Sequence, residues 1–137
     1  MVRWVSAIGV CLGLVFSSVA GAQTGKELLH ACELLRRGMH VEGNTVYLPP
    51  GSNVVQCWGF IEAVAQYTAL TDQDGKPRLN ACPGPDTTVT EVLRVFVEYG
   101  EAHPEKLDMR AAGVAYEAMT EAFPCSKSRR SHGTFSQ

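Results

Sequence analysis

The stretch SNVVQCWGFIEAVAQYTAL, residues 52–70, decides the fold of this 137-residue chain. Its apolar positions recur at helical spacing, which predicts one helix with a single inner face. That face comprises Val54, Cys57, Trp58, Ile61, Ala65 and Thr68. We expect Gln56 to close the N-terminal cap. Gly59 costs about 1 kcal/mol relative to alanine inside a helix, and we interpret it as a sign that another backbone packs closely there.

Three further segments around this stretch have helical patterns. Capping boxes at Thr24–Glu27 and Thr88–Glu91 begin two of them, and the third begins near Asp108. The inner face of the segment after Thr24 comprises Leu28, Cys32, Leu35 and Met39. That of the segment after Thr88 comprises Val89, Val92, Leu93, Phe96 and Tyr99. The segment that begins near Asp108 has an inner face of Ala111, Ala112, Ala115, Ala118, Met119, Ala122 and Phe123. Residues 38–53 and 71–85 are rich in turn formers, although 45–48 fits a short extended piece. The sequence therefore predicts an all-α fold, a small disulfide-stapled bundle of about four helices.

Four cysteines follow a secretory signal pattern, which indicates an oxidising compartment and two disulfides. A short turn at 103–106 makes the last two helices an antiparallel hairpin. Cys82 lies before the open end of that hairpin and Cys125 after it, so we expect them to pair. Cys32 and Cys57 would then form the other disulfide. The rival pairing of Cys57 with Cys82 is also permitted by the length of the second loop.

Residues 1–22 have the pattern of a cleaved signal peptide: an arginine, an apolar run and the Ala20-Gly21-Ala22 cleavage site. The alternative is a retained membrane anchor, but the apolar run is shorter than the roughly 20 residues of a spanning helix. We expect one domain at 23–125 and a disordered polar tail at 126–137. Without residues 1–22, the chain has 11 basic and 14 acidic residues, which gives a net charge of −3. No nucleic acid or membrane partner is expected for such a chain.

The residues do not indicate an enzyme, a cofactor or a metal. His30 and Cys32 are two positions apart and do not face each other on a helix, and two disulfides leave no thiol free. The histidines are scattered, without zinc-ligand spacing. Trp58 fits the core better than it fits an exposed binding anchor.

The chain resembles a known family in an ordered set of short motifs. They are Cys57-Trp58-Gly59-Phe60-Ile61, Cys82-Pro83, Tyr99 with His103-Pro104-Glu105, and Ala122-Phe123-Pro124-Cys125. Together they resemble the Rap/Tai group, periplasmic immunity proteins of type VI secretion systems. Ala63 and Ala65 stand where a glycine is often found, and Gly100 stands where leucine would be more usual.

The resemblance implies a periplasmic, non-enzymatic protein that inhibits a peptidoglycan amidase effector, often as a homodimer. Such a protein would place a loop in the groove of the amidase, which uses a cysteine–histidine pair. Two loops fit this role: 41–53, which presents Tyr47, and 72–80, which presents Asp72, Asp74, Lys76 and Arg78. Ordinary solvated turns would have the same composition. Alternative functions are an acid-stress chaperone of the periplasm, a small-ligand carrier or another periplasmic protein-binding module.

Overall fold

A computed structural model describes residues 23–125. The expected signal peptide and the expected polar tail lie outside the described residues. The helices are α1 (Gly25–Gly38), α2 (Ser52–Thr68), α3 (Val89–Ala102) and α4 (Ala111–Ala122), with a 3₁₀ turn, η1 (Pro104–Lys106), between α3 and α4. A two-stranded antiparallel hairpin, β1 (His40–Glu42) and β2 (Thr45–Tyr47), separates α1 from α2. The prediction of an all-α, disulfide-stapled bundle of about four helices is confirmed in its four helices and two disulfides, and the two-stranded hairpin is an addition to it.

The starts of α1 and α3 follow from local side-chain hydrogen bonds. At α1 the Thr24 hydroxyl accepts from the Glu27 amide at 3.3 Å, and the Glu27 carboxylate accepts from the Thr24 amide at 2.9 Å. This reciprocal pair is the expected capping box, and it lowers the pKa of Glu27. At α3 the Thr88 hydroxyl accepts from the Glu91 amide at 3.2 Å.

The expected cap at α2 is wrong. Gly51 occupies the cap position and no side chain closes it. The helix starts at Ser52, so Gln56 is the fifth helical residue and lies beyond the first turn, whose free amides a cap would satisfy.

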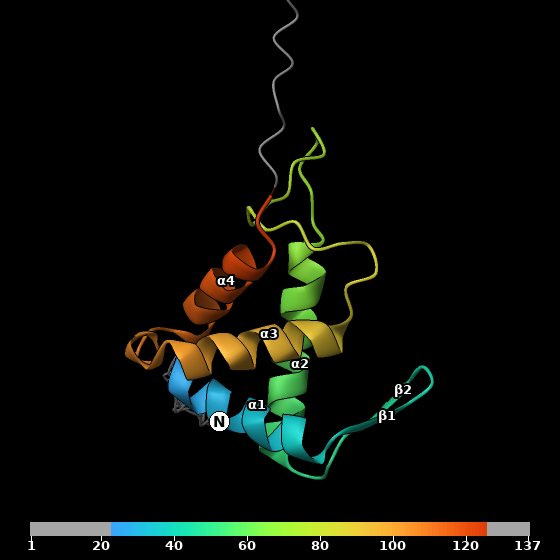
Figure 1. Ribbon diagram of the computed structural model, residues 1–137, viewed down its shortest axis with the longest axis vertical. Coiled ribbons are helices and arrows are strands. Elements are labelled where there is room, and N and C mark those ends of the chain that lie inside the picture. The colour runs from blue at the N-terminus through green and yellow to red at the C-terminus, as the bar shows by residue number, and fades with distance from the viewer. Residues whose placement is uncertain (1–22, 126–137) are drawn as a thin grey trace, which may run out of the picture.

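The helices enclose one core. Helices α1 and α3 lie side by side, α2 crosses both, and α4 packs against α1 and α3 (Figure 1). The largest fully buried side chains come from all four helices: Leu28, Leu35, Ile61, Val92, Leu93, Phe96, Val97, Val114 and Met119. The expected inner faces supply most of this core. In α4, however, Ala112 and Ala122 are exposed, and Val114, which was not expected, is fully buried.

Helix α4 begins three residues later than expected because the preceding segment pairs with the start of α1. The Gly25 amide donates to the Met109 carbonyl at 2.8 Å, and the Ala111 amide donates to the Gln23 carbonyl at 2.9 Å. Gly25 is buried at this crossing, where an added Cβ would lie 2.6 Å from Cγ2 of Val114. This position therefore requires glycine.

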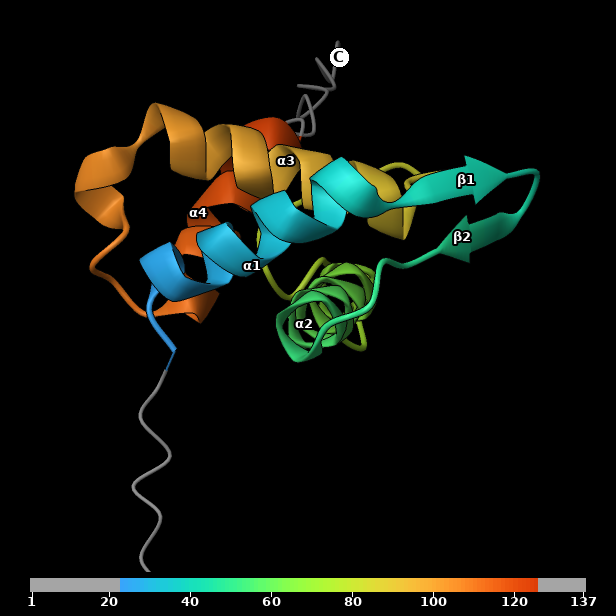
Figure 2. The same cartoon turned by 90° about the horizontal axis from the view of Figure 1, so that it is seen from below.

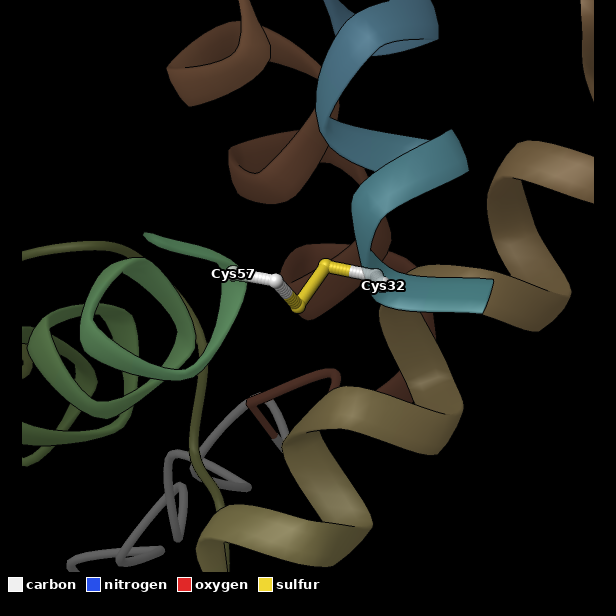
Figure 3. Close-up of a disulfide and its surroundings, with 2 residues drawn as sticks. All are labelled: Cys32 and Cys57. Atoms are coloured by element: carbon white, nitrogen blue, oxygen red, sulfur yellow. A yellow bond between two sulfur atoms is a disulfide. The ribbon is translucent and has the colours of Figure 1, made fainter. Parts of the chain in front are cut away.

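Two disulfides join elements that are distant in sequence. Cys32 of α1 bonds to Cys57 of α2, and both are fully buried (Figure 3). Cys82, before α3, bonds to Cys125, after α4, where the Cys82 amide also donates to the Phe123 carbonyl at 2.8 Å. This is the pairing that the helix-hairpin argument favoured over Cys57–Cys82. The second disulfide is the more accessible, since Cys82 is exposed.

Gly59 is a different kind of glycine from Gly25. It is exposed, and a Cβ added there would meet no atom within 4 Å. The expectation that a backbone packs against it within the fold is wrong, because this side of α2 is turned away from the other helices. Among residues 23–125, no helix is both long and apolar enough to cross a membrane.

Candidate protein-binding surface

The hairpin β1–β2 extends away from the helices into solvent (Figure 2). Its register pairs His40 with Tyr47, Val41 with Val46 and Glu42 with Thr45. Gly43, at φ +59°, and Asn44 form the two-residue turn at its tip. An apolar side chain is presented to solvent on each strand, because Val41 is 52% exposed and Tyr47 is 46% exposed.

Tyr47 is held in place although it is exposed. Its ring stacks on the His40 ring across the strand pair, with 4.7 Å between the centroids and 6° between the planes. Cross-strand aromatic pairs of this kind stabilise a hairpin. A side chain that is already ordered loses less conformational entropy when a partner covers it. Tyr47 therefore has the geometry of a preorganised anchor.

The base of the hairpin is fixed to the bundle. Gly38, the last residue of α1, lies against the ring of Pro49, so closely that a Cβ on Gly38 would lie 2.7 Å from Cγ of Pro49. Trp58 of α2 is partly buried and packs against the core, as expected. It also lines a groove with Val41 and Val46 of the hairpin and Val89 of α3. The hairpin is thus held at a defined angle to the helices.

The second predicted loop, 72–80, is ordered by one of its own acidic residues. The Asp72 carboxylate accepts hydrogen bonds from the backbone amides of Asp74, at 3.0 Å, and Lys76, at 2.8 Å. The Arg78 amide donates to the Leu70 carbonyl at 3.0 Å and closes the loop. Asp72 therefore shapes the turn. The side chains of Asp74, Lys76 and Arg78 are exposed and make no ion pair within the described part of the chain.

The fold separates the two predicted loops. The hairpin precedes α2 and the charged loop follows it, at opposite ends of the helix (Figure 1). A helix of 17 residues spans about 25 Å. Tyr47 therefore does not share one compact patch with Lys76 and Arg78.

A comparison with protein families shows to which family the chain belongs. Residues 24–125, which are nearly all of the described domain, match the family described as Rap1a immunity proteins. The chain belongs to this family. No curated protein and no solved structure matches it. The resemblance found in the cysteine and aromatic motifs is therefore confirmed.

Membership of the Rap1a immunity proteins implies a non-enzymatic protein that binds a cognate effector protein. Within residues 23–125, no group of three histidine, cysteine or acidic side chains could hold a metal ion. Effector immunity is a binding function, so the relevant surface is one that a protein can cover. The hairpin is one such surface, because Val41 and Tyr47 are about half exposed on it.

Three residues of α3, η1 and α4, namely Tyr99, Lys106 and Glu117, have a structural role in this immunity protein. The Tyr99 hydroxyl donates to the Glu117 carboxylate at 2.7 Å, and the Lys106 ammonium lies 3.1 Å from the same oxygen. The hydrogen bond from Tyr99, followed by that from Lys106, lowers the pKa of Glu117. Burial, with the hydrogen bond to Glu117 second, raises the pKa of Tyr99 to about 12. These contacts connect α3, η1 and α4, which explains why Tyr99 belongs to the motif set.

Sequence reasoning missed that 40–47 is a hairpin rather than a loop with one extended piece. The signal was Gly43-Asn44 between Val41-Glu42 and Thr45-Val46, a dipeptide that fits a two-residue hairpin turn. Sequence reasoning also missed His40 as the partner of Tyr47, because that pairing follows only from the register of β1 against β2.

Proposed function

We propose that this chain is exported to the periplasm as a soluble inhibitor of a type VI secretion peptidoglycan amidase. The family match over residues 24–125 carries the proposal. The buried disulfide and the signal pattern of residues 1–22 support an oxidising compartment. In this role the protein acts stoichiometrically and protects the cell wall from cleavage of its peptide stems.

The hairpin is the inhibitory element of this proposal. It is narrow, anchored at its base and carries an ordered aromatic side chain, which suits insertion into a groove that binds an extended peptide. Tyr47 and Val41 would contact the groove, and peptidoglycan would be excluded from the cysteine–histidine pair of the amidase. Because the charged loop lies at the other end of α2, Asp74, Lys76 and Arg78 would stay outside this groove. They would meet the effector only where its contact extends along the helix, and there they would affect partner choice and association rate more than affinity.

The test is capture followed by inhibition. The mature, oxidised protein is immobilised, and bound proteins from secreted and periplasmic extracts are identified by mass spectrometry. We expect a cysteine amidase among them, and we expect its hydrolysis of purified peptidoglycan to stop at a 1:1 molar ratio of the two proteins. Capture of many unfolded proteins at low pH only, with no effect on any amidase, would instead support the chaperone alternative.

The matched variants are Tyr47→Ala on the hairpin and Tyr67→Ala on α2, since both tyrosines are about half exposed. Only the hairpin variant should weaken inhibition. Equal loss in both variants would contradict the assignment of the hairpin as the inhibitory element.

A further inference from the structure

The residue expected to begin the mature chain is a glutamine, and the fold uses its backbone. Cleavage after residues 20–22 would leave Gln23 as the new N-terminus. The Gln23 carbonyl accepts a hydrogen bond from the Ala111 amide at 2.9 Å. The backbone pairing that joins the start of α1 to the start of α4 therefore includes the expected first residue of the mature protein.

The next residue matters as much to the fold. Thr24 caps α1 with its hydroxyl and pairs with Arg110 in an antiparallel bridge. An aminopeptidase that removed Gln23 would take away the partner of the Ala111 amide, and removal of Thr24 would then take away the helix cap. Stepwise trimming from this end would thus damage the fold from its first step.

We propose that Gln23 is a modification site, where the mature chain closes its own N-terminus as pyroglutamate. The proposal rests on the export and signal cleavage of the proposed function, but it does not involve the effector. The nitrogen of the new α-amino group attacks Cδ of the Gln23 side chain and forms a C–N bond. The bond from Cδ to the side-chain nitrogen breaks, and that nitrogen leaves as ammonia with one proton of the amine. No oxidant and no second substrate are consumed.

Glutamine at this position has the chemistry that the reaction needs. Its side chain closes a five-membered ring, whereas asparagine would have to form a strained four-membered ring. The α-amino group of a peptide has a pKa of about 7.7–8.0, so roughly one tenth of it is neutral and nucleophilic at pH 7. Cyclisation can therefore proceed under the mild conditions of the periplasm.

Cyclisation also removes a positive charge from an unfavourable place. An ammonium on Gln23 would lie directly before the cap of α1, at the positive end of the helix dipole. The Glu27 carboxylate offsets part of this repulsion, although one of its oxygens already accepts from the Thr24 amide at 2.9 Å. The lactam ring of pyroglutamate carries no charge, so it avoids the repulsion altogether.

A polar groove beside Gln23 can hold the ring. It has a volume of about 430 Å³, and its other lining residues are Glu27, His30, Ala31, Asn53 and Gln56. The lactam offers one N–H donor and one carbonyl acceptor, and the side-chain amides of Asn53 and Gln56 provide both donors and acceptors. Ring and groove are thus compatible in size and polarity.

The test is the mass of the N-terminal peptide after export of the full chain. The protein is produced with its own signal segment, released from the periplasm and kept at pH 7 until its mass is constant. Trypsin then cuts after Lys26, and tandem mass spectrometry of peptide 23–26 distinguishes ammonia loss at Gln23 from loss at an internal asparagine. We expect this peptide to be about 17 Da lighter than its unmodified sequence and to resist an aminopeptidase.

Gln23→Asn is the matched control, because it keeps a carboxamide but cannot close the five-membered ring. Its peptide should have the unmodified mass and should be degraded by the aminopeptidase. An unmodified peptide 23–26 in the parent protein would overturn the proposal, and so would cleavage at another residue or no cleavage. Amidase inhibition is measured separately on the same samples. A parent protein that inhibits with a free amine overturns only the modification, and a modified protein that inhibits no amidase overturns only the proposed function.

Discussion

The end of α1 and the hairpin that follows it are neighbours in sequence but differ in almost every physical respect. Cys32 and Leu35 are fully buried, and the disulfide to Cys57 fixes α1 to α2. A few residues later, Val41 and Tyr47 are exposed to solvent on a hairpin. The hairpin is held by backbone pairing, by the stack of His40 on Tyr47 and by the contacts at its base. In the proposed function, stability and effector binding thus depend on different side chains. Substitutions in one region should leave the property of the other unchanged.

Removal of the buried disulfide should have the largest effect. Chain entropy for a loop of 25 residues gives about 3.5 kcal/mol for Cys32→Ala/Cys57→Ala, and the loss of two buried sulfurs from the core adds to it. The measurement is urea unfolding followed by circular dichroism. At urea concentrations where the variant is still folded, its affinity for the effector should equal that of the parent. A stable variant with weakened binding would contradict the separation of the two regions.

The reverse effect is expected for Tyr47→Ala. Loss of a central aromatic anchor should cost about 2 kcal/mol of binding free energy, or about 30-fold in Kd. The free energy of unfolding should change by less than about 0.5 kcal/mol, because the side chain is exposed. Calorimetric titration against the captured effector and urea unfolding give the two values. His40→Ala, which removes the stacking partner only, should weaken binding less.

Two helical glycines give a matched pair within the stable region. Gly25→Ala forces a methyl group to within 2.6 Å of Val114 and 3.2 Å of the Leu107 carbonyl, so we expect a loss of about 1–3 kcal/mol. Gly59→Ala meets open space and should stabilise the protein by up to about 1 kcal/mol through helix propensity. Changes of opposite sign in the free energy of unfolding, measured with urea, would support the packing described here. Equal losses of stability in both variants would show that α2 is closely packed at Gly59 after all.

The smallest effect concerns pH. The pKa of Glu117 is lowered in the folded state by the Tyr99 hydrogen bond, so its contribution is present above the ordinary carboxylate pKa of 4.5 and is lost as the pH falls below it. Tyr99→Phe removes that bond, and we expect a flatter decline of the free energy of unfolding between pH 5 and pH 3. The pKa of Tyr99 is raised to about 12, so its own contribution is lost only between about pH 10 and 12. If the free energy of unfolding of Tyr99→Phe declined as steeply as that of the parent between pH 5 and pH 3, the contact between Tyr99 and Glu117 would be excluded as the cause of that decline.

The regular parts of the fold could be predicted because their causes are local. Thr24 and Thr88 mark helix starts through their own hydroxyls, and Leu28, Ile61 and Phe96 lie at helical spacing on buried faces. The later start of α4 could not be predicted, because backbone pairing of Gly25 with Met109 joins residues more than 80 positions apart. Gly100 has the same kind of explanation. It packs under Leu29 of α1, where a Cβ would lie 3.0 Å from the nearest methyl group.

The geometry of the proposed binding surface was predicted only in part, for a related reason. Tyr47 was selected for its residue type, but its partner His40 and its position on a projecting hairpin depend on strand register. Asp72 was grouped with Asp74, Lys76 and Arg78 by charge, yet its carboxylate is used by the turn itself.

The most direct test of the central claim replaces the hairpin alone. A variant in which residues 40–47 become a glycine–serine linker should keep both disulfides and its helical content, since none of these residues is fully buried. The measurement is hydrolysis of purified peptidoglycan by the captured amidase, titrated with the parent protein and with this variant. The account predicts complete inhibition by the parent at 1:1 and at least 100-fold weaker inhibition by the folded variant. Equal inhibition by both would show that the immunity surface lies elsewhere on the molecule.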